Sequence, residues 1–145
     1  MRAYAEIISG TNRESRRMWY TKICTYTGFT GEIVKGEHNI TECQKQIKKV
    51  YYEEEVKVNP NVLKSVKEAD LIILSMGSLY TSIIPNLLNK ELIKVLDKSK
   101  AKIVYVCNIM TQPGETDNFK VSNHVSLLNK YLGKRKIDVV IANNG

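Results

Sequence analysis

Residues 69–88 read ADLIILSMGSLYTSIIPNLL, and the rest of the chain is organised around this stretch. A short apolar run comes first, small and hydroxyl-bearing residues follow around Gly77, and Pro85 opens a second apolar segment. This order is typical of a buried strand, a glycine turn and the start of a helix. Ligands of open α/β sheets bind where strands end and helices begin, so the stretch predicts a ligand-binding edge. The alternative reading is an ordinary connection between a strand and a helix.

Length and composition predict one domain with a real core. The chain has 145 residues, of which 43% are hydrophobic. It has no apolar run of bilayer length and no segment typical of a signal peptide, so we expect a cytoplasmic protein without a membrane span. The three cysteines, Cys24, Cys43 and Cys107, are widely spaced and form no zinc or redox motif. We therefore expect reduced thiols.

The net charge of +7 is unevenly distributed, because four of the five arginines lie in the first 17 residues. A positive excess attracts anions, but no nucleic-acid-binding module is visible, and we expect no specific nucleic-acid partner. Residues 1–19 show weak periodicity. We interpret them as a leader with little regular structure, followed by the domain proper over residues 20–145.

The domain alternates between strand and helix patterns. It opens with a hairpin of two strands at residues 20–26 and 32–35. Asn59 and Pro60 begin a helix, because Asn caps and Pro suits the first helical position. Ser122 is the predicted cap of the last helix, which Gly133 ends. The other predicted elements are strands at residues 47–52, 71–74, 103–107 and 139–141 and a helix at residues 87–97.

The order of these elements predicts the fold class. Strands separated by helices form parallel pairs through right-handed crossovers. We therefore expect the strands at residues 71–74, 103–107 and 139–141 to be parallel and adjacent. The predicted architecture is a Rossmann-like, three-layer α/β fold with a mainly parallel sheet and a small N-terminal β-hairpin.

Two predicted loops leave the ends of neighbouring strands and face one crevice. Glycine allows close backbone approach, while hydroxyls and amides bind phosphate, sugar or base edges. The Glu115 side chain could accept a hydrogen bond from a ribose hydroxyl or hold a cation through a water molecule. A long surface connection is the alternative for the second loop. The candidate ligand-binding residues are Gly77, Ser78, Thr81 and Ser82 in the first loop and Asn108, Thr111, Gln112, Glu115 and Thr116 in the second.

Several phrases carry a family resemblance. They are SLYTSIIPNLL, VCNIMTQPGETDNF at residues 106–119, SNHV at residues 122–125 and DVVIANN at residues 138–144. Together they resemble the gluconeogenesis factor (YvcK-type) proteins and their relatives, the 2-phospho-L-lactate transferases (CofD-like). The family begins with a strand and a GGGTG-like loop that residues 1–19 do not match. The resemblance therefore implies the later part of a family domain, a truncated form whose first glycine-rich βα unit is missing.

The resemblance also implies a function. YvcK-type proteins bind UDP-sugars, notably UDP-N-acetylglucosamine, and affect carbon metabolism and cell shape in bacteria. The transferase relatives move a phospholactyl group from a guanosine-linked donor and use Mg²⁺, which this chain would need only if it were transferase-like. Binding without catalysis is favoured, because the matched region shows no P-loop, no close carboxylate pair and no Ser–His–Asp arrangement. A fragment acting only through protein contacts is the third alternative, and a homo-oligomer stays open.

Carried onto this chain, the resemblance points to six of the candidate ligand-binding residues: Gly77, Ser78, Asn108, Thr111, Gln112 and Glu115. No catalytic residue and no metal ligand is assigned. His124 matches a family position, and a structural role for it is as good an interpretation as a functional one. Met76 stands where the family has proline, and Asn123, just before His124, replaces an acidic residue. The chain therefore departs from the family at these two positions.

Overall fold

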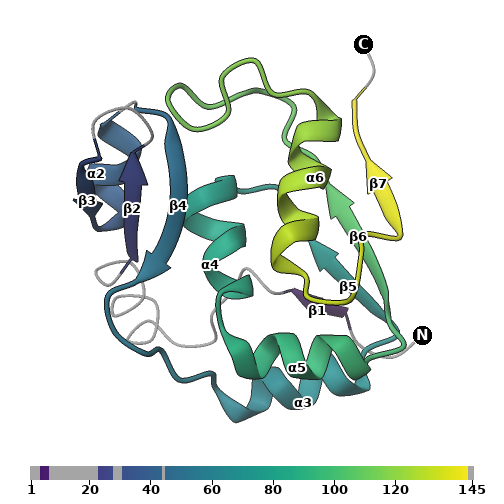
Figure 1. The fold of residues 1–145 in the computed structure, drawn as a ribbon. Helices are drawn as coiled ribbons and strands as arrows, with labels where there is room; N and C mark the ends of the chain where they lie inside the picture. The colour runs from purple at the N-terminus through teal and green to yellow at the C-terminus, as the bar shows by residue number, and fades with distance from the viewer. Residues whose placement is uncertain (1–3, 7–22, 28–30, 44, 144–145) are drawn as a thin grey trace.

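The computed structural model describes residues 4–6, 23–27, 31–43 and 45–143, with side chains from residue 31 onward. Their strands form two sheets (Figure 1). One is a four-stranded parallel sheet in the order β1–β5–β6–β7, and the other is a three-stranded antiparallel sheet in the order β3–β2–β4. The α/β class and the mainly parallel sheet are confirmed.

The parallel sheet is built from the predicted apolar runs. Strand β5 (Leu71–Leu74) pairs with β6 (Lys102–Val106), which pairs on its other side with β7 (Val139–Ile141). The predicted parallel, adjacent arrangement of these three strands is confirmed. Strand β1 (Tyr4–Glu6) adds to the free side of β5 and lies within the predicted leader. Residues 1–3 and 7–19 of that leader lie outside the described residues.

The second sheet contains the predicted hairpin. Strand β2 (Ile23–Thr27) pairs antiparallel with β3 (Ile33–Lys35), and β4 (Ile47–Tyr52) pairs with the other side of β2. The centre of the hairpin turn, residues 28–30, lies outside the described residues. A short helix, α2 (Glu37–Glu42), follows β3 and was not predicted.

The helices begin at side-chain caps, although not always the predicted ones. Asn59 caps α3 (Pro60–Glu68) by accepting from the Asn61 N–H at 2.9 Å, as predicted. Helix α5 (Lys90–Lys98) begins later than predicted, because a π-helix, η1 (Leu79–Ile83), and the short α4 (Ile84–Leu87) precede it. The Asn89 side chain caps α5.

The predicted cap of the last helix was wrong. Helix α6 (Val121–Tyr131) starts at Lys120, whose N–H donates to Asn123 Oδ1 at 2.8 Å, while Ser122 lies exposed in the first turn. The amide of Asn123 reaches back one turn to the orphan N–H group, as a capping side chain does. Capping chemistry was therefore present in this phrase, but on the neighbouring residue.

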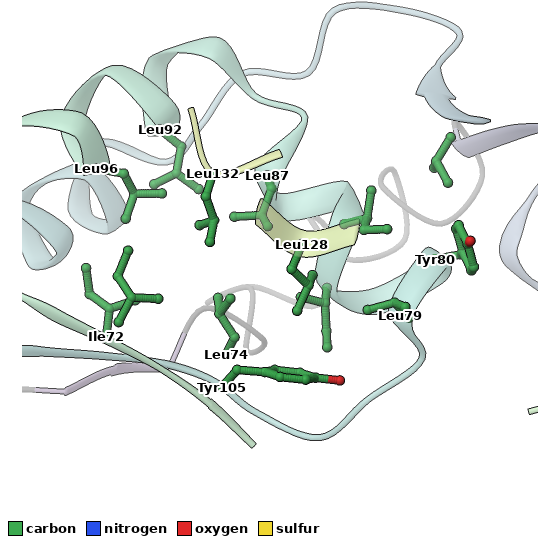
Figure 2. Packing of buried hydrophobic residues seen from close by; sticks show 14 of the residues in the cluster. Ile72, Leu74, Leu79, Tyr80, Leu87, Leu92, Leu96, Tyr105, Leu128 and Leu132 are labelled. Atoms are coloured by element: carbon green, nitrogen blue, oxygen red, sulfur yellow. The ribbon is translucent and has the colours of Figure 1, made fainter. Parts of the chain in front are cut away.

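The core lies between the parallel sheet and its helices. Ile72, Leu74 and Tyr105 point from β5 and β6 toward leucines of α5 and α6, as Figure 2 shows. Burial of this kind is the main favourable term in folding. The leucines on the helix side are Leu92, Leu96, Leu128 and Leu132.

Helix α4 joins the second sheet to this core (Figure 1). The Tyr52 hydroxyl at the end of β4 donates to the Pro85 carbonyl of α4 at 3.0 Å. The Asn89 side chain also donates to the carbonyl of Val56, in the segment that leaves β4. Helix α2 also lies beside η1 (Leu79–Ile83), which contains the end of the first candidate loop.

Candidate functional site

The first loop leaves β5 and turns into a π-helix. Ser78 caps this helix by accepting from the Thr81 N–H at 3.1 Å. The Ile83 N–H donates to the Ser78 carbonyl five residues earlier, at 3.1 Å. Such wide turns are rare and occur frequently at functional sites. Thr81 is buried, and Ser82, half-buried, accepts from the Asn86 side chain at its carbonyl.

The second loop leaves β6 and closes a tight turn over residues 112–116. The Thr116 N–H donates to the Gln112 carbonyl at 2.9 Å, and the Gln112 N–H donates to Thr116 Oγ1 at 2.8 Å. Gly114 sits at the tip with a φ of 78°, a left-handed conformation that glycine adopts without strain. The turn is therefore a defined structure with a buried hydroxyl.

Two sets of hydrogen bonds join the loops. The Asn108 side chain accepts from the Gly77 N–H at 3.1 Å and donates to the Gly77 carbonyl at 2.9 Å. The Ser78 hydroxyl donates to Glu115 Oε2 at 2.6 Å. The predicted meeting of the loops thus occurs through four of the candidate residues. Hydrogen bonds within each loop hold three further candidates: Thr81 donates to Ser78 in the first loop, and Gln112 donates to Thr116 in the second. The other two candidates take no part in these bonds, since Thr111 is exposed and Ser82 lies farther along η1.

These bonds change the chemistry expected of the first loop. Gly77 was predicted to let its backbone approach a ligand closely and Ser78 to offer its hydroxyl, but the Gly77 N–H and the Ser78 O–H are both engaged inside the protein. Their present role is to hold the loops in one arrangement. The sequence indicated the residue types, while the long-range pairing that occupies them depends on the fold.

Glu115 is the most unusual group of the site. Its side chain is only 4% exposed. Burial raises the pKa of its carboxyl, while hydrogen bonds from the Ser78 hydroxyl and the Tyr80 backbone act in the opposite direction. The pKa of Glu37, at the start of α2, is also raised, first by burial and then by the charge of Glu115. Perturbed carboxyls of this kind cluster at functional sites.

An apolar rim adjoins these polar groups. Met76 precedes Gly77, while Ile109 and Met110 follow Asn108, and the latter two are 75% and 80% exposed. Because Asn108 is bonded to Gly77, the rim residues of the two loops stand next to each other. Met76 is also a departure from the family, whereas the exposure of Ile109 and Met110 was not predicted from the sequence.

A buried aromatic pair supports the second loop from behind. Tyr105 Oη lies 2.9 Å from His124 Nδ1 in a hydrogen bond, and Phe119 packs edge-on against the imidazole. Burial lowers the pKa of His124. His124 thus packs inside the protein, and Tyr105, which sequence reasoning missed, is its partner. A tyrosine in a buried strand usually has a hydrogen-bond partner, and this was the signal available.

We expect His124 to make stability depend on pH. Because its folded-state pKa lies below the unfolded value of about 6.5, the unfolded chain binds more protons at mildly acidic pH. The stabilisation is complete above that value and is lost as pH falls toward the folded pKa. Urea unfolding of the wild type and of His124→Gln, measured from about pH 7.5 to about pH 5.5, should show a decline that the variant lacks. An equal decline in both proteins would contradict the assignment.

Fold and site together define a class: an α/β protein whose parallel sheet presents two mutually bonded loops at the carboxyl ends of adjacent strands. Comparison with known proteins specifies the family. Residues 21–145 match the family described as 2-phospho-L-lactate transferase CofD, and the chain belongs to that family.

Curated relatives include gluconeogenesis factors of two bacteria. The protein of Bacillus subtilis is 44% identical over 115 residues, covering 79% of this chain and 36% of that protein. The protein of Listeria monocytogenes is 48% identical over 114 residues, covering 78% and 35%. The chain therefore spans about a third of the length of these relatives.

A solved structure shares the fold. A UPF0052-family protein of Bacillus halodurans superposes with a TM-score of 0.78 at 34% identity, over 85% of this chain and 40% of that one. The predicted family and fold are thus confirmed. In the part of the chain that the structure describes, no helix is both long and apolar enough to cross a membrane.

Proposed function

We propose that this chain binds a nucleotide, in particular a UDP-sugar such as UDP-N-acetylglucosamine, at the edge formed by the two loops. The observation that carries the proposal is the bonding of Gly77 to Asn108 and of Ser78 to Glu115, which joins the loops after adjacent parallel strands. Nucleotides bind at this position in many open α/β sheets. The nine candidate residues, with Thr111 and Ser82 at the outer side, are the proposed contacts.

The proposal extends to the biological role. Relatives named gluconeogenesis factors support a regulatory function in carbon metabolism, and we include the effect on cell shape and a cytoplasmic location in the proposal. Transfer of a phospholactyl group is the second candidate, which the family description favours. Binding remains our first choice, because the matched region of the sequence shows no P-loop, no close carboxylate pair and no Ser–His–Asp arrangement.

Isothermal titration with UDP-N-acetylglucosamine, UDP and GDP tests the proposal. We expect a dissociation constant of about 10⁻⁴ M for the UDP-sugar, since several loop donors are already engaged within the protein. Thr111→Val should weaken binding about fivefold, the loss of one neutral hydrogen bond. Ser65→Ala, an exposed change on α3 away from the loops, is the control.

The titration also separates the alternatives. Absence of heat for every nucleotide, with a folded protein, would refute nucleotide binding and leave a function through protein contacts. Mg²⁺-dependent turnover of a guanosine-linked donor would establish the transferase instead. Equal affinity for UDP and UDP-N-acetylglucosamine would show that the sugar is not recognised.

A further inference from the structure

Strand β7 forms one edge of the parallel sheet. It stands last in the order β1–β5–β6–β7 and, among the strands that the structure describes, pairs with β6 alone. An edge strand presents a row of backbone N–H and C=O groups that can pair with another chain, and proteins usually protect such edges with charged residues, proline or bulges. The protection of β7 can therefore be compared with that of the other edges.

The four edge strands of the two described sheets differ in charge. Strand β1 contains Glu6, β3 contains Lys35, and β4 contains Lys48 and Lys49. Strand β7 is the one edge strand of these two sheets that consists only of β-branched apolar residues, with the sequence VVI. It therefore lacks the charges that protect the other three edges from pairing.

The side chains of β7 are exposed on both faces of the sheet. Val139, Val140 and Ile141 are 48%, 37% and 55% exposed. The register sets Val140 beside Tyr105, which points toward the helices, so Val139 and Ile141 lie on the opposite face. Three successive apolar side chains are thus exposed on a strand whose backbone pairs on one side only.

The acidic residue next to β7 is held by its own chain. Asp138 Oδ2 accepts the Ile103 N–H at 2.8 Å, and Lys102 and Arg135 form ion pairs with the carboxylate. The residues that follow the strand, 142–145, are uncharged. Apart from the basic segment at residues 134–136, the sequence around β7 therefore carries no charge that would oppose a second apolar strand.

We propose that β7 is a self-association surface, at which it pairs antiparallel with β7 of a second copy across a two-fold axis at Val140. This register sets Val140 opposite Val140 of the second copy, and Val139 opposite Ile141. Apolar residues then meet at every position of the strand, as a self-complementary two-fold interface requires. The two four-stranded sheets become one continuous sheet. This inference does not depend on the proposed nucleotide.

Charge favours the antiparallel arrangement over a parallel one. Each copy has a net charge of +7, and Lys134, Arg135 and Lys136 precede β7. A parallel pair would set these basic segments side by side. The two-fold arrangement separates Lys136 of the two copies by about 25 Å, at about 3.3 Å per residue. This exceeds the Debye length of about 10 Å at 0.1 M salt, so the repulsion is largely screened.

The contact is small, so the association should be weak. Strand β7 has 3 residues. Stable interfaces bury about 800 Å² on each partner, and a pair of such short strands covers less than this. We therefore expect a dissociation constant of about 10⁻⁴ M, in the range of transient dimers.

Sedimentation velocity of the full chain, from about 10 μM to about 1 mM, tests the proposal across the expected dissociation constant. We expect an equilibrium between monomer and dimer. In ¹H–¹⁵N NMR spectra over the same range, the amide signals of residues 138–142 should shift as the concentration rises. Raising NaCl from about 0.05 M to about 0.3 M should tighten the dimer, because salt screens the repulsion between two positively charged copies.

Ile141→Lys and Ile33→Lys form a matched pair of variants. Both isoleucines lie on edge strands, they are 55% and 54% exposed, and each substitution adds the same charge. Ile141→Lys should weaken the dimer at least about tenfold, because a charge on an edge strand opposes pairing and each dimer contains it twice. Ile33→Lys should associate like the wild type. Val139→Thr keeps the β-branched shape, should weaken the dimer about threefold, and tests the surface even if Ile141→Lys does not fold.

Several results would overturn the proposal. A monomer at about 1 mM would show that no second copy binds β7. Equal association by the wild type and Ile141→Lys, or shifts confined to Met76, Ile109 and Met110, would mean that another surface makes the contact. Species that grow beyond a dimer would indicate head-to-tail pairing of β7 with β1, the other edge of the described parallel sheet. A dimer that weakens as salt rises would indicate association through ion pairs instead.

Discussion

Replacement of Gly133 by valine should lower the free energy of unfolding by about 3 kcal/mol or more. Gly133 follows α6 with a φ of 64°, a left-handed conformation that a β-branched residue adopts only with strain. A Cβ atom there would lie 2.8 Å from both Asp97 Oδ1 and Ile93 Cγ2 of α5. Asp97 cannot move freely, because it accepts the Lys134 N–H at 2.8 Å. Backbone strain, a clash and a lost hydrogen bond therefore add together.

Urea unfolding followed by circular dichroism measures the effect. Gly133→Asn is the matched control, because asparagine tolerates the left-handed conformation better than any β-branched residue. It should lose clearly less stability than the valine variant, since only the contact with α5 remains unfavourable. If both variants lost the same amount, the contact with Asp97 and Ile93 would be the whole effect and backbone strain would contribute nothing.

The second large effect is expected at Asn108. Asn108→Leu keeps the size of the side chain but leaves the Gly77 N–H and carbonyl without their partner. Each unsatisfied group costs about 1–3 kcal/mol where water cannot replace the bond, so a loss of about 2–4 kcal/mol is expected. The loops would also separate, and binding of the UDP-sugar should fall by at least about tenfold.

Unfolding and isothermal titration on the same variant test both parts. Asn61→Leu, an exposed change in the first turn of α3, is the control and should leave nucleotide affinity unchanged. Normal affinity in Asn108→Leu, together with the expected loss of stability, would show that each loop keeps its binding shape by itself. Normal stability would show that water replaces the amide.

Sequence patterns predicted the parts of the fold that local chemistry determines. Apolar runs at residues 71–74 and 103–107 became the central strands, and the Asn59–Pro60 pair marked the start of α3. Strand β1 was not predicted, because its three residues carry no pattern and pairing with β5 makes them a strand. The start of helix α6 was predicted wrongly for another reason. Ser122 and Asn123 are neighbouring residues that both cap helices well, and residue type alone does not distinguish them.

The candidate site was predictable in its residue types and not in its bonding. Glycine, serine and amides after two buried strands indicated where the loops would meet. The occupation of the Ser78 hydroxyl by Glu115, and the burial of Glu115, join residues far apart in sequence. A glutamate beside Pro113 and Gly114 looks like a solvent-facing loop residue until the turn folds over it. The buried Oε1 atoms of Gln112 and Glu115, which accept no hydrogen bond from the residues that the structure describes, could therefore be recognised only in the folded protein.

The pairing of β1 also has a consequence for the order of folding. Strands β5 and β6 are joined by a short crossover, whereas β1 must find β5 across nearly half of the chain. Closing a longer loop costs more entropy, so the central pair should assemble first and β1 should join a sheet that already exists. Amide hydrogen exchange should be slowest in β5 and β6 and faster in β1. During synthesis β1 would thus leave the ribosome well before β5 and would be among the last of the described strands to gain its partner.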